Sequence, residues 1–137
     1  MDISTLAVVE TAKHHVRSPE EVPLYDANKQ PVTITLYGPG STAYKRAQAK
    51  IANRIGEKFQ RKGKFSLTAD ERESDQIELL VACTVSFDNF SYPAATGATG
   101  AELFRAVYSD PALGFLREQV QQFVNDWSSF TSSSEKS

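Results

Sequence analysis

The feature that most constrains the fold is a change of hydrophobic period across a glycine-proline-glycine break. Within residues 32–37, Val, Ile and Leu alternate with Thr and Tyr, which is the period-two pattern of a β-strand with one buried face. Residues 38–40 interrupt this pattern, and apolar side chains then recur at steps of three and four residues. The sequence therefore predicts a strand followed at once by a helix over 41–62, with Ser41 as its N-cap.

The strand over 32–37 needs a partner, and the residues just before it supply one candidate. We predict a β-hairpin over 21–37, with the first strand around 22–25 and turn chemistry from Asp26 to Lys29. Pro23 lacks an N–H donor, which confines this first strand to a sheet edge. The stretch before the hairpin is ambiguous, because its apolar residues fit a short strand or a helical turn.

Three more helices are predicted downstream, over 69–86, 100–108 and 111–127. Thr68 and Glu71 have the spacing of a capping box, in which each side chain bonds the backbone N–H of the other residue. Proline stands at the first position of the last helix, where its missing N–H costs nothing.

These elements predict an α+β fold, with a small N-terminal β-hairpin followed by about four α-helices. The length of 137 residues corresponds to one domain, which we place at 1–130. The polar segment 131–137 is expected to be a disordered tail.

The bulk composition excludes several classes of protein. A net charge of -2 does not indicate a nucleic-acid partner, and Cys83 is the only cysteine, so no internal disulfide can form. Cys83 lies in an apolar run and is expected to be buried and inert. No basic region precedes an apolar stretch near Met1, and no run approaches the ~20 apolar residues of a membrane span. We therefore expect a cytoplasmic protein without membrane contact.

The sequence contains no pattern typical of a catalytic or metal site. His14 and His15 are adjacent, so their side chains do not converge easily on one metal ion. Residues 38–42 lack the Gly-Lys-Ser/Thr ending of a phosphate-binding loop. The acidic cluster over 70–78 fits the start of a helix, where the helix dipole favours negative charge. We predict no enzymatic activity, no metal and no cofactor.

One segment carries a strong local charge. Between residues 41 and 64, eight Lys and Arg residues stand against a single Glu. Lys50, Arg54 and Lys58 share one face of the predicted helix, off its apolar stripe. This face could be solvated, could pair with the acidic helix that follows, or could dock an acidic partner. The alternative function is that of a nucleic-acid-associated phage or bacterial protein that uses the basic helix 45–64, which we rank below protein docking.

The last predicted helix carries an apolar seam with steps of three and four residues, formed by Leu113, Leu116, Val120, Phe123 and Trp127. The seam could lie entirely in the core. Alternatively, its distal part at Phe123 and Trp127 could contact a partner or a second copy of the chain, because only polar tail follows it.

Several segments in order resemble one protein family. Residues 32–44 are similar to the strand–glycine–serine–helix opening of the tail assembly chaperones of long-tailed bacteriophages. Residues 79–90 resemble the central helix and aromatic exit of that family, and residues 103–130 resemble its closing segment. The resemblance covers most of residues 20–130, although the connector over 92–97 differs from the more polar one that is common in the family.

The resemblance implies a chaperone that binds the tape measure protein and helps tail tube protein subunits assemble around it. Such proteins act in the host cell cytoplasm and are absent from the mature virion. The resemblance also implies that translational frameshifting near the C-terminus can produce a longer form. The distal seam is also the candidate surface for a homo-oligomer. Our candidate partner-binding residues are those of the basic face and the distal seam, namely Lys50, Arg54, Lys58, Phe123 and Trp127.

Overall fold

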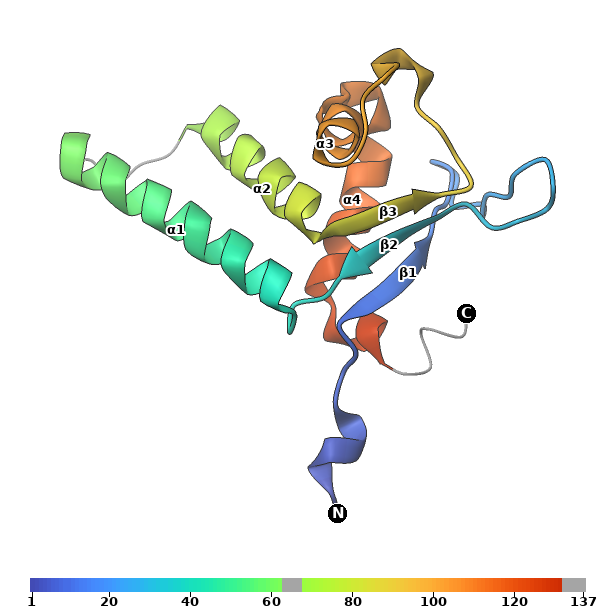
Figure 1. Cartoon of the computed structure of the whole chain (residues 1–137), viewed down its shortest axis with the longest axis horizontal. Helices are drawn as coiled ribbons and strands as arrows, with labels where there is room; N and C mark the ends of the chain where they lie inside the picture. Colours follow the sequence, from blue (N-terminus) through green and yellow to red (C-terminus); the bar gives the residue numbers. More distant parts are fainter. Residues whose placement is uncertain (63–67, 132–137) are drawn as a thin grey trace.

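The computed structural model describes residues 1–62 and 68–131. Within them, three antiparallel strands form one sheet in the order β1-β2-β3, and helices cover one of its faces (Figure 1). The strands are β1 (Thr11–His15), β2 (Thr33–Tyr37) and β3 (Thr84–Asp88). The α-helices are α1 (Thr42–Lys62), α2 (Ala69–Cys83), α3 (Ala101–Ser109) and α4 (Gly114–Asn125), and 3₁₀ turns span Ile3–Leu6, Pro93–Ala95, Pro111–Leu113 and Trp127–Phe130. The predicted α+β fold class is confirmed.

The predicted hairpin over 21–37 is wrong in its first strand. The central strand β2 pairs with β1, so that Ala12 lies opposite Leu36 and His14 opposite Ile34. Residues 22–25 do not form a strand, and Pro23 and Tyr25 make only isolated bridges. Prolines at both ends of this loop lack the N–H donors that a continuous ladder requires.

The turn that was predicted within this loop is present. The Asp26 side chain accepts hydrogen bonds from the backbone N–H groups of Asn28 and Gln30, both at 2.8 Å. Leu24 also joins the loop to the sheet, because its N–H donates to the Val16 carbonyl and its carbonyl accepts from the Val32 N–H. The loop is thus held by local turn chemistry although it adds no strand.

The third strand, β3, replaces the end of a predicted helix. The helix over 69–86 stops at Cys83, and the chain becomes extended at Thr84. Thr84 is β-branched, as is the next residue, and such residues pack well on a pleated sheet. The capping box at the other end of α2 is confirmed, since the side chains of Thr68 and Glu71 each accept from the other's backbone N–H.

The core lies between the helices and the inner face of the sheet. Ile34 and Leu36 of β2 are fully buried there. Three helices supply the opposing apolar side chains, which are Ile77, Leu80 and Val81 of α2, Phe104, Val107 and Tyr108 of α3, and Leu116, Val120 and Val124 of α4. The outer face is polar: the Asp88 carboxylate accepts from the hydroxyls of Thr33 and Thr35 at 2.9 and 2.8 Å.

Helix α1 projects from this core with α2 beside it (Figure 1). Its predicted range of 41–62 agrees with the structure, and the Ser41 hydroxyl accepts from the Tyr44 N–H as the expected N-cap. None of the described side chains of α1 is buried. The residues expected to end this helix, from Gly63 on, lie outside the described ranges, as does most of the polar tail predicted over 131–137.

The last predicted helix is divided. Pro111–Leu113 forms a 3₁₀ turn, α4 ends at Asn125, and Trp127 therefore lies beyond the helix that was expected to contain it. Asp126 has an extended backbone, and its side chain accepts from the Ser128 N–H to cap a second 3₁₀ turn. The chain reverses its course here and places Phe130 in the core.

Two glycine positions give a test of this packing. A Cβ at Gly38 would lie 2.7 Å from the ring of buried Phe130, whereas a Cβ at Gly56 meets nothing within 4 Å. Gly38→Ala should destabilise the fold by about 2 kcal/mol through overpacking. Gly56→Ala, in the middle of exposed α1, should stabilise it by about 0.5–1 kcal/mol. Urea unfolding of both variants checks this, and an unchanged free energy of unfolding for Gly38→Ala would contradict the placement of Phe130.

Candidate functional site

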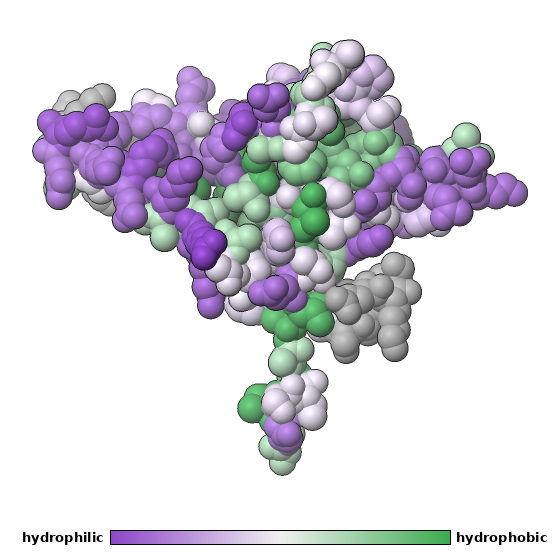
Figure 2. Space-filling model, in the orientation of Figure 1, coloured by the Kyte–Doolittle hydropathy of each residue, from purple (hydrophilic) through white to green (hydrophobic). Residues whose placement is uncertain are grey.

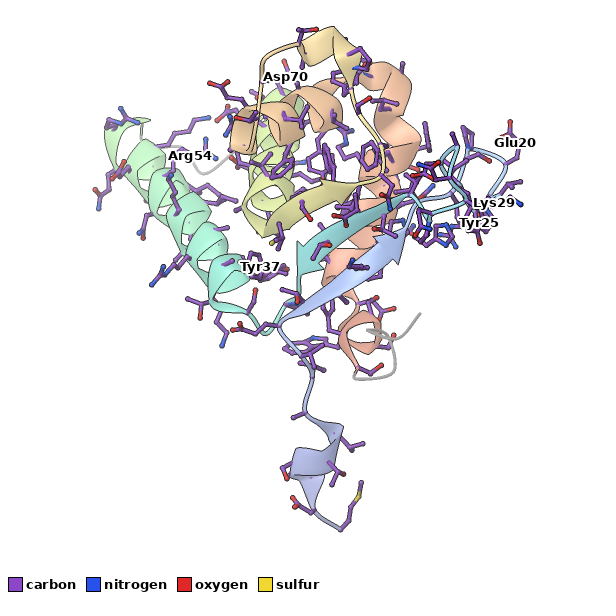
Figure 3. All side chains as sticks on the ribbon, turned by 45° about the vertical axis from the view of Figure 1, so that its right-hand side comes forward. Glu20, Tyr25, Lys29, Tyr37, Arg54 and Asp70 are labelled. Carbon is purple, nitrogen blue, oxygen red and sulfur yellow. The ribbon has the colours of Figure 1, made fainter. Side chains whose placement is uncertain are left out.

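The basic face of α1 is largely paired within the chain. Arg54, which Figure 3 shows on α1, forms an ion pair with Asp75, and Lys58 forms one with Glu71; both acids lie on α2. The hydrogen bond from Arg105 lowers the pKa of Glu78, and the charge of exposed Lys50 acts in the same direction. The sequence left open whether this face is solvated, pairs with the acidic helix or docks a partner. For Arg54 and Lys58, the structure shows pairing with the acidic helix.

The acidic cluster of α2 has a matching structural role. Besides the two pairs with α1, Glu78 accepts from the Arg105 guanidinium of α3 at 2.6 and 3.0 Å. Glu73 accepts from Arg117 of α4 at 2.9 Å. The carboxylates of α2 thus connect it to three other helices. Each of these pairs has at least one partner that water reaches, and solvent-screened ion pairs contribute roughly 0–1 kcal/mol each, so they add little to the stability of the helix packing.

Phe123 and Trp127 have different environments. Phe123 is half-buried, with its ring centroid 5.1 Å from that of His14 and 5.3 Å from that of Phe130. Trp127 is 55% exposed, and its ring covers Gly40, where a Cβ would lie 3.0 Å away. The distal seam therefore divides into a packing residue and a surface residue.

Trp127 belongs to a larger apolar area that the sequence did not indicate. Val8 also flanks Gly40, and the N-terminal segment leaves the body from this point (Figure 1). Its 3₁₀ turn exposes Ile3 by 73% and Leu6 by 60%. We call Ile3, Leu6, Val8 and Trp127 the basal apolar surface; Figure 2 shows hydrophobic residues at this neck and along the segment.

The N-terminal segment is attached to the body by a backbone bond. The Val9 N–H donates to the Phe130 carbonyl at 2.7 Å, which joins the segment to the turn that carries Trp127. The only sequence signal for this region was the short apolar stretch at residues 6–9, which fitted a strand or a helical turn equally well. Exposed apolar side chains gathered at one end of a small domain are typical of a binding surface.

The two histidines lie on opposite faces of the sheet and have separate partners. His14 is only 7% exposed, and its Nε2–H donates to Gln119 Oε1 at 3.0 Å. The Nε2–H of His15 donates to the Leu24 carbonyl at 2.8 Å, and its ring meets Tyr25 edge-on. Across residues 1–62 and 68–131, no three His, Cys, Asp or Glu side chains gather as metal ligands would.

Cys83 is buried at the end of α2, and burial raises the pKa of its thiol to about 12. A thiol with so high a pKa is protonated at neutral pH and is a poor nucleophile. Within the described ranges, no helix combines the length and the apolar character that crossing a membrane requires.

Comparison of the chain with protein-family models, with curated proteins and with solved structures gives no match. The functional argument therefore depends on the surfaces described above.

The contrast between Phe123 and Trp127 predicts different outcomes for single substitutions. Phe123→Ala should lower the free energy of unfolding by about 3 kcal/mol, because contacts with His14 and Phe130 are lost. Trp127→Ser should cost less than about 1 kcal/mol, since more than half of this side chain is exposed. Thermal or urea unfolding decides, and equal losses for the two variants would contradict the division of the seam.

His14 predicts a dependence of stability on pH. Burial lowers the pKa of His14 below 6.5, Arg17 and His15 lower it further, and the bond to Gln119 opposes the shift. Below pH 6.5 the unfolded chain therefore binds a proton that the folded chain resists, and folded stability falls until the folded pKa is passed.

Between pH 7.5 and 5.5, the wild type should lose more unfolding free energy than His14→Asn, whose amide does not titrate. Urea unfolding at three pH values measures the difference. Equal losses in the two proteins would show that another group titrates in this window.

Proposed function

We propose that this protein is a tail assembly chaperone of a long-tailed bacteriophage or prophage. It binds the tape measure protein through the basal apolar surface and promotes assembly of tail tube protein around it. The observation that supports this most directly is the exposure of Ile3 and Leu6 on the N-terminal segment and of Trp127 at Gly40, where that segment leaves the body. Leaving such large apolar groups in water is unfavourable by roughly 1.5–3 kcal/mol per side chain, relative to full burial.

A long helical protein is a suitable partner for this surface. Such a protein presents an apolar stripe that must be covered until its own assembly partners arrive, and an amphipathic helix docks through anchors spaced at i, i+3, i+4 and i+7. The rigid part of the surface, Trp127 over Gly40, lies at the strand–glycine–serine–helix opening on which the resemblance to the family rests. The N-terminal segment, whose Val8 also flanks Gly40, carries exposed Ile3 and Leu6 farther from the body.

The charged arm formed by α1 and α2 fits a secondary role in this function. Figure 2 shows that its exposed side is hydrophilic. Because Arg54 and Lys58 are paired with α2, these cations are not available to phosphate groups unless the pairs break. This pairing counts against the nucleic-acid alternative, and Lys50 is an exposed cation of this face that could assist an acidic partner.

The chaperone acts, on this proposal, in the host cell cytoplasm before the tail is complete, and it is absent from the mature virion. Self-association through the same basal surface would hide the apolar groups while no partner is bound. Binding of the tape measure protein would then compete with self-association.

The test is co-expression with the long helical protein encoded beside this chain in its source genome. Tagged wild-type protein should retain the helical protein through affinity and size-exclusion steps. Trp127→Ser and Leu6→Ser should each reduce the retained amount at least fivefold while lowering the melting temperature by no more than about 5 °C, because both side chains are exposed.

Val22→Ser is the matched control, since Val22 is a 56% exposed apolar residue on the distant loop before the Asp26 turn. This variant should retain the partner as the wild type does. Retention that is equal in all four proteins would contradict the role of the basal surface. Absence of any complex with the wild type would contradict the chaperone function itself.

A further inference from the structure

Strand β1 is an edge strand with hydrogen-bonding groups directed away from the sheet. Gly38 N–H donates to the Glu10 carbonyl, and Val16 N–H donates to the Val32 carbonyl, so the even-numbered residues of this segment bond to β2. Antiparallel pairing alternates along a strand. The N–H and C=O groups of the odd-numbered residues therefore point to the outer edge.

The two ends of this outer edge are already occupied by the C-terminal part of the chain. At one end, Val9 N–H donates to the Phe130 carbonyl. At the other end, the Gln119 side chain pairs with the backbone of Arg17: its Oε1 accepts from the Arg17 N–H at 3.0 Å, and its Nε2 donates to the Arg17 carbonyl at 2.8 Å. An amide side chain thus takes the place that a neighbouring strand would take. Between these ends lie the outward groups of Thr11, Lys13 and His15.

A groove runs along this part of the edge. Its volume is about 590 Å³. One wall is β1, a second is formed by Gln119, Gln122 and Phe123 of α4, and a third is formed by Pro23 and Tyr25 of the loop between β1 and β2. Figure 3 shows Tyr25 at the end of the molecule formed by this loop. A peptide residue occupies on the order of 130 Å³ in a close-packed interior, so the groove holds a segment of about four or five residues.

The walls of the groove are both basic and apolar. Lys13, His14, His15 and Arg17 line it, and Asp126 is the acidic residue among its lining side chains. The Nε of Arg17 is buried and has no hydrogen-bond partner among the described residues.

We propose that this groove binds a short, extended peptide segment with acidic side chains, which adds to the sheet beside β1. The segment would exchange backbone hydrogen bonds with Lys13 and His15 and place carboxylates on the face of Lys13 and Arg17. Its alternate, apolar side chains would lie on the opposite face, against Phe123. Edge strands pair readily with extended chains. In such complexes the backbone hydrogen bonds supply the affinity, and the pockets for alternate side chains supply the specificity. This site is separate from the basal apolar surface and does not depend on the chaperone function.

A peptide fits the groove better than another polyanion does. The outward edge of β1 offers both N–H donors and C=O acceptors at strand spacing. A peptide backbone matches both kinds of group. A polyphosphate or a nucleic-acid backbone offers acceptors to the N–H groups and leaves the carbonyls unmatched.

The test uses acetylated and amidated five-residue probes with the purified full-length chain, followed by ¹H–¹⁵N NMR. The sequence Glu-Val-Glu-Val-Glu should shift the amide signals of Lys13 and His15 and slow their exchange with solvent. Lys-Val-Lys-Val-Lys and a backbone N-methylated acidic probe should bind at least tenfold more weakly, because the first has the wrong charge and the second lacks N–H donors.

Two charge reversals localise the binding. Lys13→Glu should weaken binding of the acidic probe about fivefold to tenfold. Lys45→Glu, which makes the same change in net charge on exposed α1, should leave binding unchanged. The proposal is overturned if the N-methylated probe binds as well as the parent, if the shifts lie outside the groove, or if tripolyphosphate displaces the peptide at equal concentration.

Discussion

A buried chain of hydrogen bonds at Thr84 determines how the helices meet the sheet. The Thr84 hydroxyl lies 2.7 Å from the Leu80 carbonyl and 2.7 Å from the Tyr108 hydroxyl. A carbonyl can only accept, so Thr84 donates to Leu80 and accepts from Tyr108. The first bond satisfies the Leu80 carbonyl in the last turn of α2, and β3 begins at Thr84 without a connecting loop. The second bond attaches α3 at the same residue. Because α2 starts from this junction, the position of α1 and of its ion pairs with α2 also depends on it.

The parts of the fold that the sequence predicted are those with local signals. The caps at Ser41 and Thr68 and the turn at Asp26 depend on residues within four positions of one another, and the structure contains all three. Strand β1 depends instead on a pairing with β2 across a long loop. Its inward residues are Ala12 and His14, which give no hydrophobic alternation. Strand β3 was hidden for another reason. Thr84 and Val85 continue the spacing of the preceding helix, and their β-branched preference for a strand is supported by contacts that the spacing does not show, the pairing with β2 and the bond to Tyr108.

The candidate binding residues show the same limit. Spacing correctly placed Arg54 and Lys58 on one face of α1, yet it could not establish that this face meets the acids of α2, because the approach of two helices is not a local property. For Phe123 and Trp127, spacing predicted one continuous seam. The extended backbone at Asp126 breaks it, so that one aromatic ring packs against His14 while the other remains at the surface. The groove beside β1 had no sequence signal, since its lining comes from three separate segments.

The C-terminal segment connects the two surfaces that we propose for recognition. Gln119 closes one end of the β1 groove, and Phe123 forms part of its wall. Phe123 contacts Phe130, which packs under Gly38, and the same turn carries Trp127 over Gly40. These contacts fix the positions of Phe123 in the groove and of Trp127 in the basal apolar surface. Neither side chain therefore has to become ordered when a partner binds. A preorganised surface loses less conformational entropy on binding, and this allows modest contact areas to bind specifically. The N-terminal segment is the exception, because Ile3 and Leu6 are exposed and lie outside the core, so the entropy cost of binding falls mainly on this part of the basal apolar surface.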